Sequence, residues 1–222
     1  MATTQSGERA PRRDAAENRA AILAAARTVL GGDPDAPLDA IVAAAGLSRR
    51  AFYGHFASRD ELRREVAQQG AARVTAAVQD VSHPDSRVVL ARIGARMWGE
   101  VEDFRVLAQR TIRGPLLDEI GDALAPLREL LLATVTRGIE NGELRQDMAP
   151  DTLARLIEGA ALAVLDEAAA HQLDHASGVA LVTGTTLGVA GLSWRETAEV
   201  VATGLADTAH DPASHFSLSK DS

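Results

Sequence analysis

The sequence predicts an all-α protein, with a small N-terminal helix-turn-helix domain of three helices followed by a larger helical bundle. Apolar residues recur along most of the chain at the three- and four-residue spacing that places them on one face of a helix. Glycine and proline separate these segments, and Ser-x-x-Glu sequences, which cap helix N-termini, begin two of them. Only 3% of the residues are aromatic, so the core is expected to be built mostly from Ala, Leu, Val and Ile.

Four helices are predicted in the first 81 residues, over 14–30, 38–45, 48–55 and 58–81. The glycine and proline residues at 31–34 end the first, and Gly46 ends the second. Ser48 is a suitable N-cap for the third helix, and the Ser58 to Glu61 capping box begins the fourth. Residues 1–13 are polar and arginine-rich, so they are expected to form a disordered arm.

Six further helices are predicted, over 86–102, 104–112, 116–141, 150–170, 177–191 and 193–207. Pro126 is expected to kink the third of these. The segment 177–191 is rich in Gly, Val and Thr, and its composition alone would allow a strand or a loop. Because the sequence offers it no partner strand, we interpret it as a helix that packs closely through small residues. Residues 209–222 resemble a disordered tail.

These elements predict a helix-turn-helix domain over 14–57 and a larger helical domain over 58–208. The chain has no cysteine, which excludes disulfides, thiolate catalysis and cysteine-based metal sites. It has no apolar run long enough for a membrane helix, and its N-terminus lacks the apolar core of a signal peptide. We therefore expect a soluble, cytoplasmic protein without a membrane partner.

The net charge of −8 is unevenly distributed along the chain. Residues 1–73 contain eleven Arg and nine Asp or Glu, whereas residues 74–222 contain twelve Lys or Arg and twenty-two Asp or Glu. Only the N-terminal part is therefore suited to contact phosphate. Nearly all the cations are arginine, which binds phosphate and guanine through paired hydrogen bonds.

The third predicted helix has two different faces. Phe52 and Phe56 are expected to turn inward, while Arg49, Arg50 and Tyr53 are expected to face outward together. A tight turn separates this helix from the second, as in a helix-turn-helix whose third helix lies in the major groove of DNA. The alternative to a DNA-contacting role is that the two arginines are ordinary solvent-exposed residues and that the tyrosine packs on the small domain.

The N-terminal segments resemble the tetracycline-repressor (TetR) family closely over residues 14–65. The matching segments are Ile22-Leu23, Ala25-Ala26, Ile41, Ala45-Gly46-Leu47-Ser48, Phe52-Tyr53-Gly54-His55-Phe56 and Ser58-Arg59-Asp60-Glu61-Leu62. Farther along, only the helical layout and the turn at 142–145 are similar. The resemblance implies a homodimeric DNA-binding regulator, a repressor by default, released from a near-palindromic operator by a small-molecule effector. It also implies that residues 14–57 form the DNA-binding domain and residues 58–208 the ligand-sensing and dimerisation domain.

The resemblance also implies roles for individual residues. Ser48 would cap the third helix and contact phosphate, Arg49 and Arg50 would bind bases or phosphates, and Tyr53 and His55 would contact the DNA backbone. Arg59, at the start of the fourth helix, would bind phosphate.

The second helix departs from the family pattern. The family usually begins it with a threonine that caps the helix and binds phosphate, whereas this chain has Pro37, and Asp39 follows close behind. Asp39 would repel a nearby phosphate, so contacts from the second helix are in question. The arginines of the arm, Arg9, Arg12 and Arg13, are expected to compensate.

In the larger domain, the segments 150–170 and 177–191 are expected to pair two chains. Bulky residues are few there, and Met97, Trp98 and Phe104 would line an apolar pocket, with Arg110 nearby for an anionic ligand. An ordinary core is an equal alternative for these residues, and Trp194 is expected to pack.

Two other function classes are considered. A helical DNA-binding dimer controlled by a protein partner would need no pocket. An enzyme is disfavoured, because the sequence offers no nucleophile motif, acid–base pair or phosphate loop. His171 and His175 have the spacing of metal ligands, but they lie at an acidic, exposed helix end, so we expect neither a metal nor a cofactor.

Overall fold

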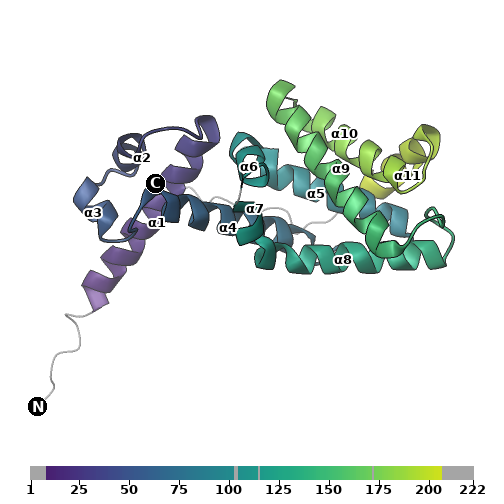
Figure 1. Cartoon of the computed structure of the whole chain (residues 1–222), viewed down its shortest axis with the longest axis horizontal. Helices are drawn as coiled ribbons and strands as arrows, with labels where there is room; N and C mark the ends of the chain where they lie inside the picture. The colour runs from purple at the N-terminus through teal and green to yellow at the C-terminus, as the bar shows by residue number, and fades with distance from the viewer. Residues whose placement is uncertain (1–8, 103–104, 115, 172, 207–222) are drawn as a thin grey trace, which may run out of the picture. The chain divides into compact units, whose positions relative to one another are not determined.

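The structure, a computed structural model, describes residues 9–102, 105–114, 116–171 and 173–206. Within these residues the regular elements are all helices (Figure 1). They are α1 Arg9–Gly32, α2 Leu38–Ala44, α3 Arg49–Tyr53, α4 Arg59–Val78, α5 Ser86–Val101, α6 Arg105–Ile112, α7 Leu116–Glu119, α8 Gly121–Glu140, α9 Pro150–His171, α10 His175–Val189 and α11 Trp194–Ala206. The predicted all-α class is therefore confirmed.

The chain forms two compact units. The first comprises residues 1–76, 100–126 and 165–172, and the second comprises 77–99, 127–164 and 173–222. The first unit contains α1, α2, α3, α6 and α7 with most of α4, and the second contains most of α5, α8 and α9 together with α10 and α11. None of the described helices is long and apolar enough to cross a membrane.

Several predicted helix bounds differ from the structure. Helix α1 begins at Arg9, so residues 9–13 of the expected disordered arm are helical, whereas residues 1–8 and the predicted tail at 209–222 lie outside the described residues. The helix expected over 116–141 is divided into α7 and α8, with the break at Ile120. Gly121, a poor helix former, follows this break.

Pro126 lies inside α8. Proline removes the hydrogen bond that its nitrogen would have donated to the carbonyl four residues earlier. Both Pro126 and Asp122 are well exposed, so water can satisfy the carbonyl of Asp122, and the helix continues. The helix predicted over the glycine-rich segment 177–191 is confirmed as α10, which begins earlier than expected because the Asp174 carboxylate caps it by accepting a 2.8 Å hydrogen bond from the Ser177 amide.

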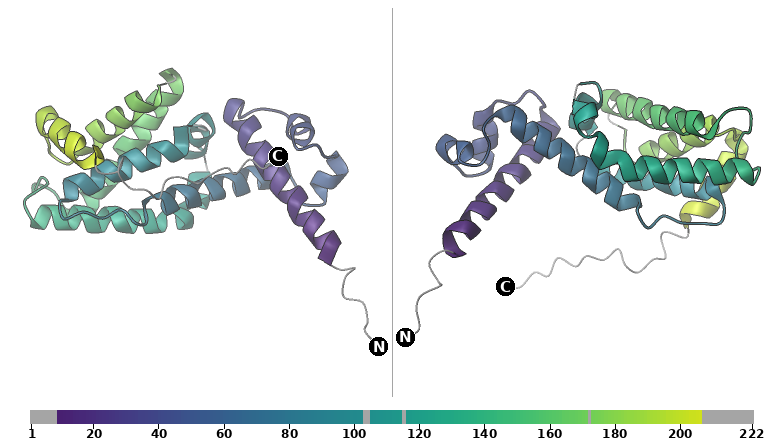
Figure 2. Two further views of the ribbon diagram at one scale, coloured as in Figure 1. Left: turned by 180° about the vertical axis from the view of Figure 1, so that it is seen from behind. Right: turned by 60° about the horizontal axis from the view of Figure 1, so that its bottom comes forward.

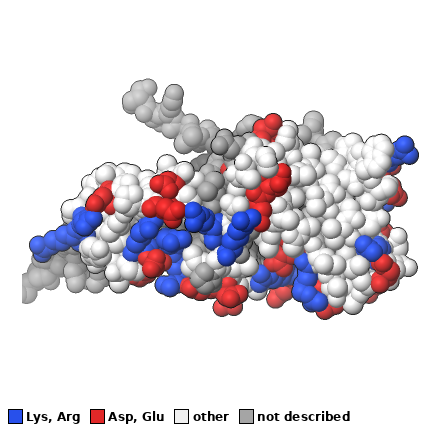
Figure 3. Space-filling view, turned by 45° about the horizontal axis from the view of Figure 1, so that its top comes forward, with Lys and Arg blue, Asp and Glu red and all other residues white. Residues whose placement is uncertain are grey.

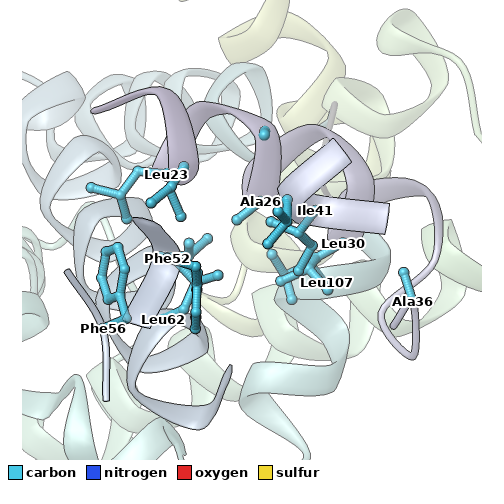
Figure 4. Close-up of a cluster of buried hydrophobic side chains, with 13 residues drawn as sticks. Leu23, Ala26, Leu30, Ala36, Ile41, Phe52, Phe56, Leu62 and Leu107 are labelled. Carbon is cyan, nitrogen blue, oxygen red and sulfur yellow. The ribbon is translucent and has the colours of Figure 1, made fainter. Parts of the chain in front are cut away.

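The core of the first unit joins α1, α2, the α3 region, α4 and α6 (Figure 4). Its residues are Ile22, Leu23, Ala25, Ala26, Leu30, Ala36, Ile41, Val42, Phe52, Phe56, Leu62, Val66 and Leu107. The predicted apolar stripes of α1 and α2 and the inward direction of both phenylalanines are thus confirmed. Leu107 is an addition from α6, more than forty residues beyond the helix-turn-helix in the sequence, and α6 is therefore part of the same hydrophobic core.

The core of the second unit joins α5, α8, α9, α10 and α11. Helices α10 and α11 lie side by side in all views (Figures 1 and 2). The buried Ser86 adds specific links: its amide donates to the Glu143 carboxylate at 2.9 Å, and the Arg137 guanidinium donates to its hydroxyl at 3.1 Å. These bonds fix the start of α5 against the end of α8 and the turn that follows it.

Candidate nucleic-acid interface

A tight turn sets the angle between α2 and α3. Gly46 has a φ of 67°, in the left-handed region that only glycine adopts without strain. Its amide donates to the Ala43 carbonyl at 3.0 Å, and the Leu47 amide donates to the Val42 carbonyl at 3.1 Å. This pair of bonds is the glycine-terminated helix end known as the Schellman motif. It stops α2 and directs the chain into the next helix.

Helix α3 is too short to be stable alone, and buried anchors hold it in place. The Ser48 hydroxyl caps it by accepting a 3.2 Å hydrogen bond from the Ala51 amide, as predicted. Phe52 is 0% exposed and Phe56 is 2% exposed, and their rings stack 5.7 Å apart. The orientation of the exposed face of α3 is therefore fixed by packing.

The opposite face of α3 carries Arg49, Arg50 and Tyr53, all exposed, as the sequence predicted. Tyr53 is 57% exposed, and its ring meets the edge of Phe52 with centroids 5.2 Å apart. Arg50 is exposed, and its guanidinium has no polar partner among the described residues. A rigid aromatic ring beside arginines with accessible N–H groups offers both phosphate and base-edge contacts.

Arg49 is paired with Asp39 of α2. Its Nη2 donates to Asp39 Oδ2 at 2.7 Å and its Nε donates to Oδ1 at 2.5 Å. These hydrogen bonds hold the pKa of the Asp39 carboxyl below its usual value, so the group is ionised at neutral pH. The expectation from sequence considered only repulsion between Asp39 and phosphate and missed this pair. The pair depends on the angle between α2 and α3, which the sequence alone does not give.

The remaining predicted residues flank this face. Ser48 is exposed, and His55 is half-buried just after α3. Arg59 is half-buried at the start of α4, where its Nη2 donates to the Pro34 carbonyl at 3.1 Å and its Nε is buried without a partner in the described residues. The guanidinium of Arg59 thus connects α4 to the loop between α1 and α2.

Several other arginines of the first unit are neutralised within the unit. Arg19 pairs with Glu65 at 3.3 Å and Arg110 pairs with Asp35 at 2.8 Å. The face drawn in Figure 3 shows the same pattern, with cationic and anionic side chains next to one another rather than in separate patches. Opposite charges are therefore interspersed over the described part of this unit, and Arg50 is a cation of α3 that forms no ion pair there.

A helix-turn-helix with an exposed arginine and tyrosine face, followed by further helices, is the arrangement typical of helical DNA-binding regulators. Residues 22–66 match the family model described as bacterial regulatory proteins, tetR family. This match covers α2, α3 and the adjoining parts of α1 and α4, so the similarity to the TetR family lies in the helix-turn-helix region. No curated protein sequence matches the chain.

Solved structures share the fold over most of the chain. The fatty acid degradation regulator FadR from Bacillus halodurans is 18% identical, with a TM-score of 0.67 over 78% of this chain and 95% of that one. FadR from Bacillus subtilis, in complex with stearoyl-CoA, is 16% identical, with a TM-score of 0.67 over 78% and 97%. A TetR-like regulator from Rhodococcus sp. RHA1 is 21% identical, with a TM-score of 0.60 over 79% and 97%.

The residues expected to line a ligand pocket have different surroundings. Trp98 is 2% exposed in the second unit, where its indole lies against Gly178 of α10, and its Nε1 has no partner among the described residues. Met97, beside it in α5, is half-buried. Arg110 belongs to the first unit and pairs with Asp35, and Phe104 lies outside the described residues.

Trp194 does not pack as expected. Its side chain is 75% exposed at the start of α11, and the guanidinium carbon of Arg195 lies 4.8 Å from its ring centroid. The capping box predicted here is present, since the Ser193 amide donates to the Glu196 carboxylate at 2.8 Å and the Glu196 amide donates to the Ser193 hydroxyl at 3.4 Å. Because Ser193 caps the helix, Trp194 lies in the first turn of α11, and its side chain is exposed there.

Proposed function

We propose that this chain is a homodimeric transcriptional repressor that a small molecule releases from a near-palindromic operator. The observation that carries the proposal is the exposed face of α3, held outward by the buried Phe52 and Phe56. In this proposal residues 14–57 read DNA, and residues 58–208 sense the effector and pair the two chains. Two copies of α3 then enter successive major grooves about 34 Å apart.

Each residue of the interface has a proposed partner in DNA. Arg49 and Arg50 bind base edges or phosphates in the major groove, and Tyr53 and His55 contact the sugar-phosphate backbone. Ser48 contacts phosphate through the hydroxyl that also caps α3, and Arg59 does so through the donors that Pro34 leaves unused. Arginine supplies most specific contacts to guanine, and phosphate contacts set the register on the duplex.

The proposed dimer interface is the exposed face of α9 and α10 in the second unit. Residues 176–193 contain no Asp, Glu, Lys or Arg. Leu156 of α9 is 49% exposed and Leu181 of α10 is 37% exposed. A Cβ built at Gly159, Gly184 or Gly188 would have no described atom within 4 Å. Exposed leucines beside open glycines support close, isologous packing against a second copy.

Replacing Gly188 by leucine is expected to weaken this dimer. A Cβ at this position meets no described atom within one chain, so the fold is expected to tolerate the change, but the side chain fills the space proposed for the partner helix. Overpacking costs about 1–3 kcal/mol, and the substitution enters an isologous interface twice. We expect the dimer dissociation constant to rise roughly 30-fold or more, measured by sedimentation equilibrium over a range of concentrations.

Gly99→Leu is the matched control. Gly99 is an exposed helical glycine of α5 with no described atom within 4 Å of its Cβ position, and it lies outside the proposed interface. This variant should dimerise like the parent protein. Equal or tighter dimerisation of Gly188→Leu, or a monomeric parent protein, would contradict the proposed interface.

The sensing role is supported by the shared fold with FadR from Bacillus subtilis, which was solved with stearoyl-CoA. We propose Met97, Trp98, Phe104 and Arg110 as the first residues to examine for effector contacts. Coupling to DNA would pass through α4 and through α6, whose Leu107 is part of the N-terminal core and whose Arg110 pairs with Asp35. An effector that displaces α6 would change how α3 is presented.

Transcription in vitro tests the repressor assignment. The template carries a duplex selected by the protein from random DNA, placed between the promoter and the start of transcription. We expect transcript to fall as protein is added, and to recover when an effector is found in a panel that starts with stearoyl-CoA. A rise in transcript would identify an activator instead. Repression that no small molecule relieves would favour control by a protein partner.

A further inference from the structure

The pair between Asp39 and Arg49 lies on the surface that is proposed to meet DNA. Both residues stay largely exposed, with 64% of the Asp39 side chain and 62% of the Arg49 side chain accessible. An exposed ion pair contributes little to folding stability. The pair therefore needs an explanation other than stability, and its position on neighbouring helices of the helix-turn-helix suggests a role in recognition.

The geometry of the pair leaves the reading edge of Arg49 free. The carboxylate occupies Nε and Nη2, which form the side edge of the guanidinium. The N–H groups that remain, on Nη1 and on the outer side of Nη2, form its end edge. That end edge can donate the two parallel hydrogen bonds that guanine accepts at O6 and N7 in the major groove.

The carboxylate also changes the energetics of binding. A free arginine side chain loses considerable rotamer freedom when it is ordered on DNA, and prior fixation reduces this loss. At the same time, an ionised carboxylate near the duplex repels phosphate, which weakens binding to DNA that offers Arg49 no guanine. Both effects increase the difference in affinity between operator and other DNA.

We propose that Asp39 is a positioning residue that determines specificity: it holds Arg49 in the orientation that reads guanine and disfavours DNA lacking a guanine at that position. The inference rests on the proposed function, in which α3 enters the major groove. It also gives a role to the difference from the TetR family pattern at the start of α2. The family usually binds phosphate here through a threonine at the position of Pro37, whereas in this chain Asp39, two residues on, would act on the recognition helix.

The experiment measures base discrimination at each position of the operator. Duplexes selected by the parent protein from random DNA are altered so that each G·C pair in turn becomes A·T, and dissociation constants are measured by fluorescence anisotropy at fixed salt. The variants are Asp39→Ala, Arg49→Ala, the double variant and Asp60→Ala. Asp60 is an exposed carboxylate of the same unit and serves as the control for loss of negative charge.

For the parent protein, we expect replacement of one guanine per half-site to weaken binding roughly 10-fold or more, and Arg49→Ala to abolish this dependence. Asp39→Ala should reduce the dependence at that same position several-fold while strengthening binding to unrelated DNA. The double variant should discriminate like Arg49→Ala, and Asp60→Ala should discriminate like the parent.

Full discrimination by Asp39→Ala at the Arg49-dependent position would overturn the inference and leave the proposed function intact. An equal loss of discrimination in Asp60→Ala would also overturn it, because the effect would then come from charge alone. A parent protein that binds no duplex from the library would overturn the proposed function and this inference together.

Discussion

Replacing Arg49 and Arg50 together by alanine is expected to weaken operator binding roughly 30-fold or more. Each arginine that binds a base edge through paired hydrogen bonds contributes about 1–3 kcal/mol, and 1.4 kcal/mol corresponds to about a factor of ten in affinity. The salt dependence of binding should also become less steep, by about one unit in slope for each phosphate contact that is lost. Fluorescence anisotropy on the selected operator, across a salt series, measures both quantities.

The control removes the same charge from the second unit. Arg145 and Arg195 are arginines of that unit, and their replacement by alanine should leave operator affinity nearly unchanged. The fold should survive in both double variants, because Arg49 and Arg50 are exposed and α3 is anchored by its phenylalanines. Operator binding by the Arg49 and Arg50 variant at the affinity of the parent would show that α3 does not read DNA.

Replacing Gly178 by alanine is expected to lower the free energy of unfolding by about 1–3 kcal/mol, the usual cost of overpacking a core. A Cβ at this position would lie 2.0 Å from Cε2 and Cζ2 of the buried Trp98 indole, so either the ring or α10 must shift. The loss is expected even though alanine favours a helix over glycine by about 1 kcal/mol. Denaturant unfolding at a fixed protein concentration measures the change, since dimerisation makes stability concentration-dependent.

Gly99→Ala makes the same change at a helical position with open space and should be neutral or stabilising. A second test uses Trp98→Leu, which removes the ring that Gly178→Ala would meet. If the two positions are in contact, the double variant should lose less stability than the two single losses added together. Additive losses, or a stabilised Gly178→Ala protein, would mean that the indole does not occupy this site.

Much of the N-terminal fold could be predicted because its signals are local. The Ser48 and Ser193 caps and the apolar stripe of α1 depend on residues within four positions of one another. The direction of Phe52 and Phe56 follows from the period of a single helix. Each of these features can be read without knowing what lies across the core.

The features that escaped prediction depend on distant residues. Leu107 enters the N-terminal core from α6, and no pattern within α6 identifies its partner. The pairing of Asp39 with Arg49 requires the angle between α2 and α3, which the turn at Gly46 sets. Trp194 was misjudged because bulk was taken to imply burial, whereas large apolar side chains are often exposed.

The place of α6 in the N-terminal core has a consequence for exchanging parts between regulators. A hybrid joined near residue 57 would take α1 to α3 from one protein and leave behind the helix that supplies Leu107 to their core. The transferred helices α1 to α3 would then expose the apolar surface that Leu107 covers, whatever operator α3 recognises. A functional hybrid therefore has to take α6 from the same protein as α1 to α3, although some fifty residues of sequence separate α6 from α3.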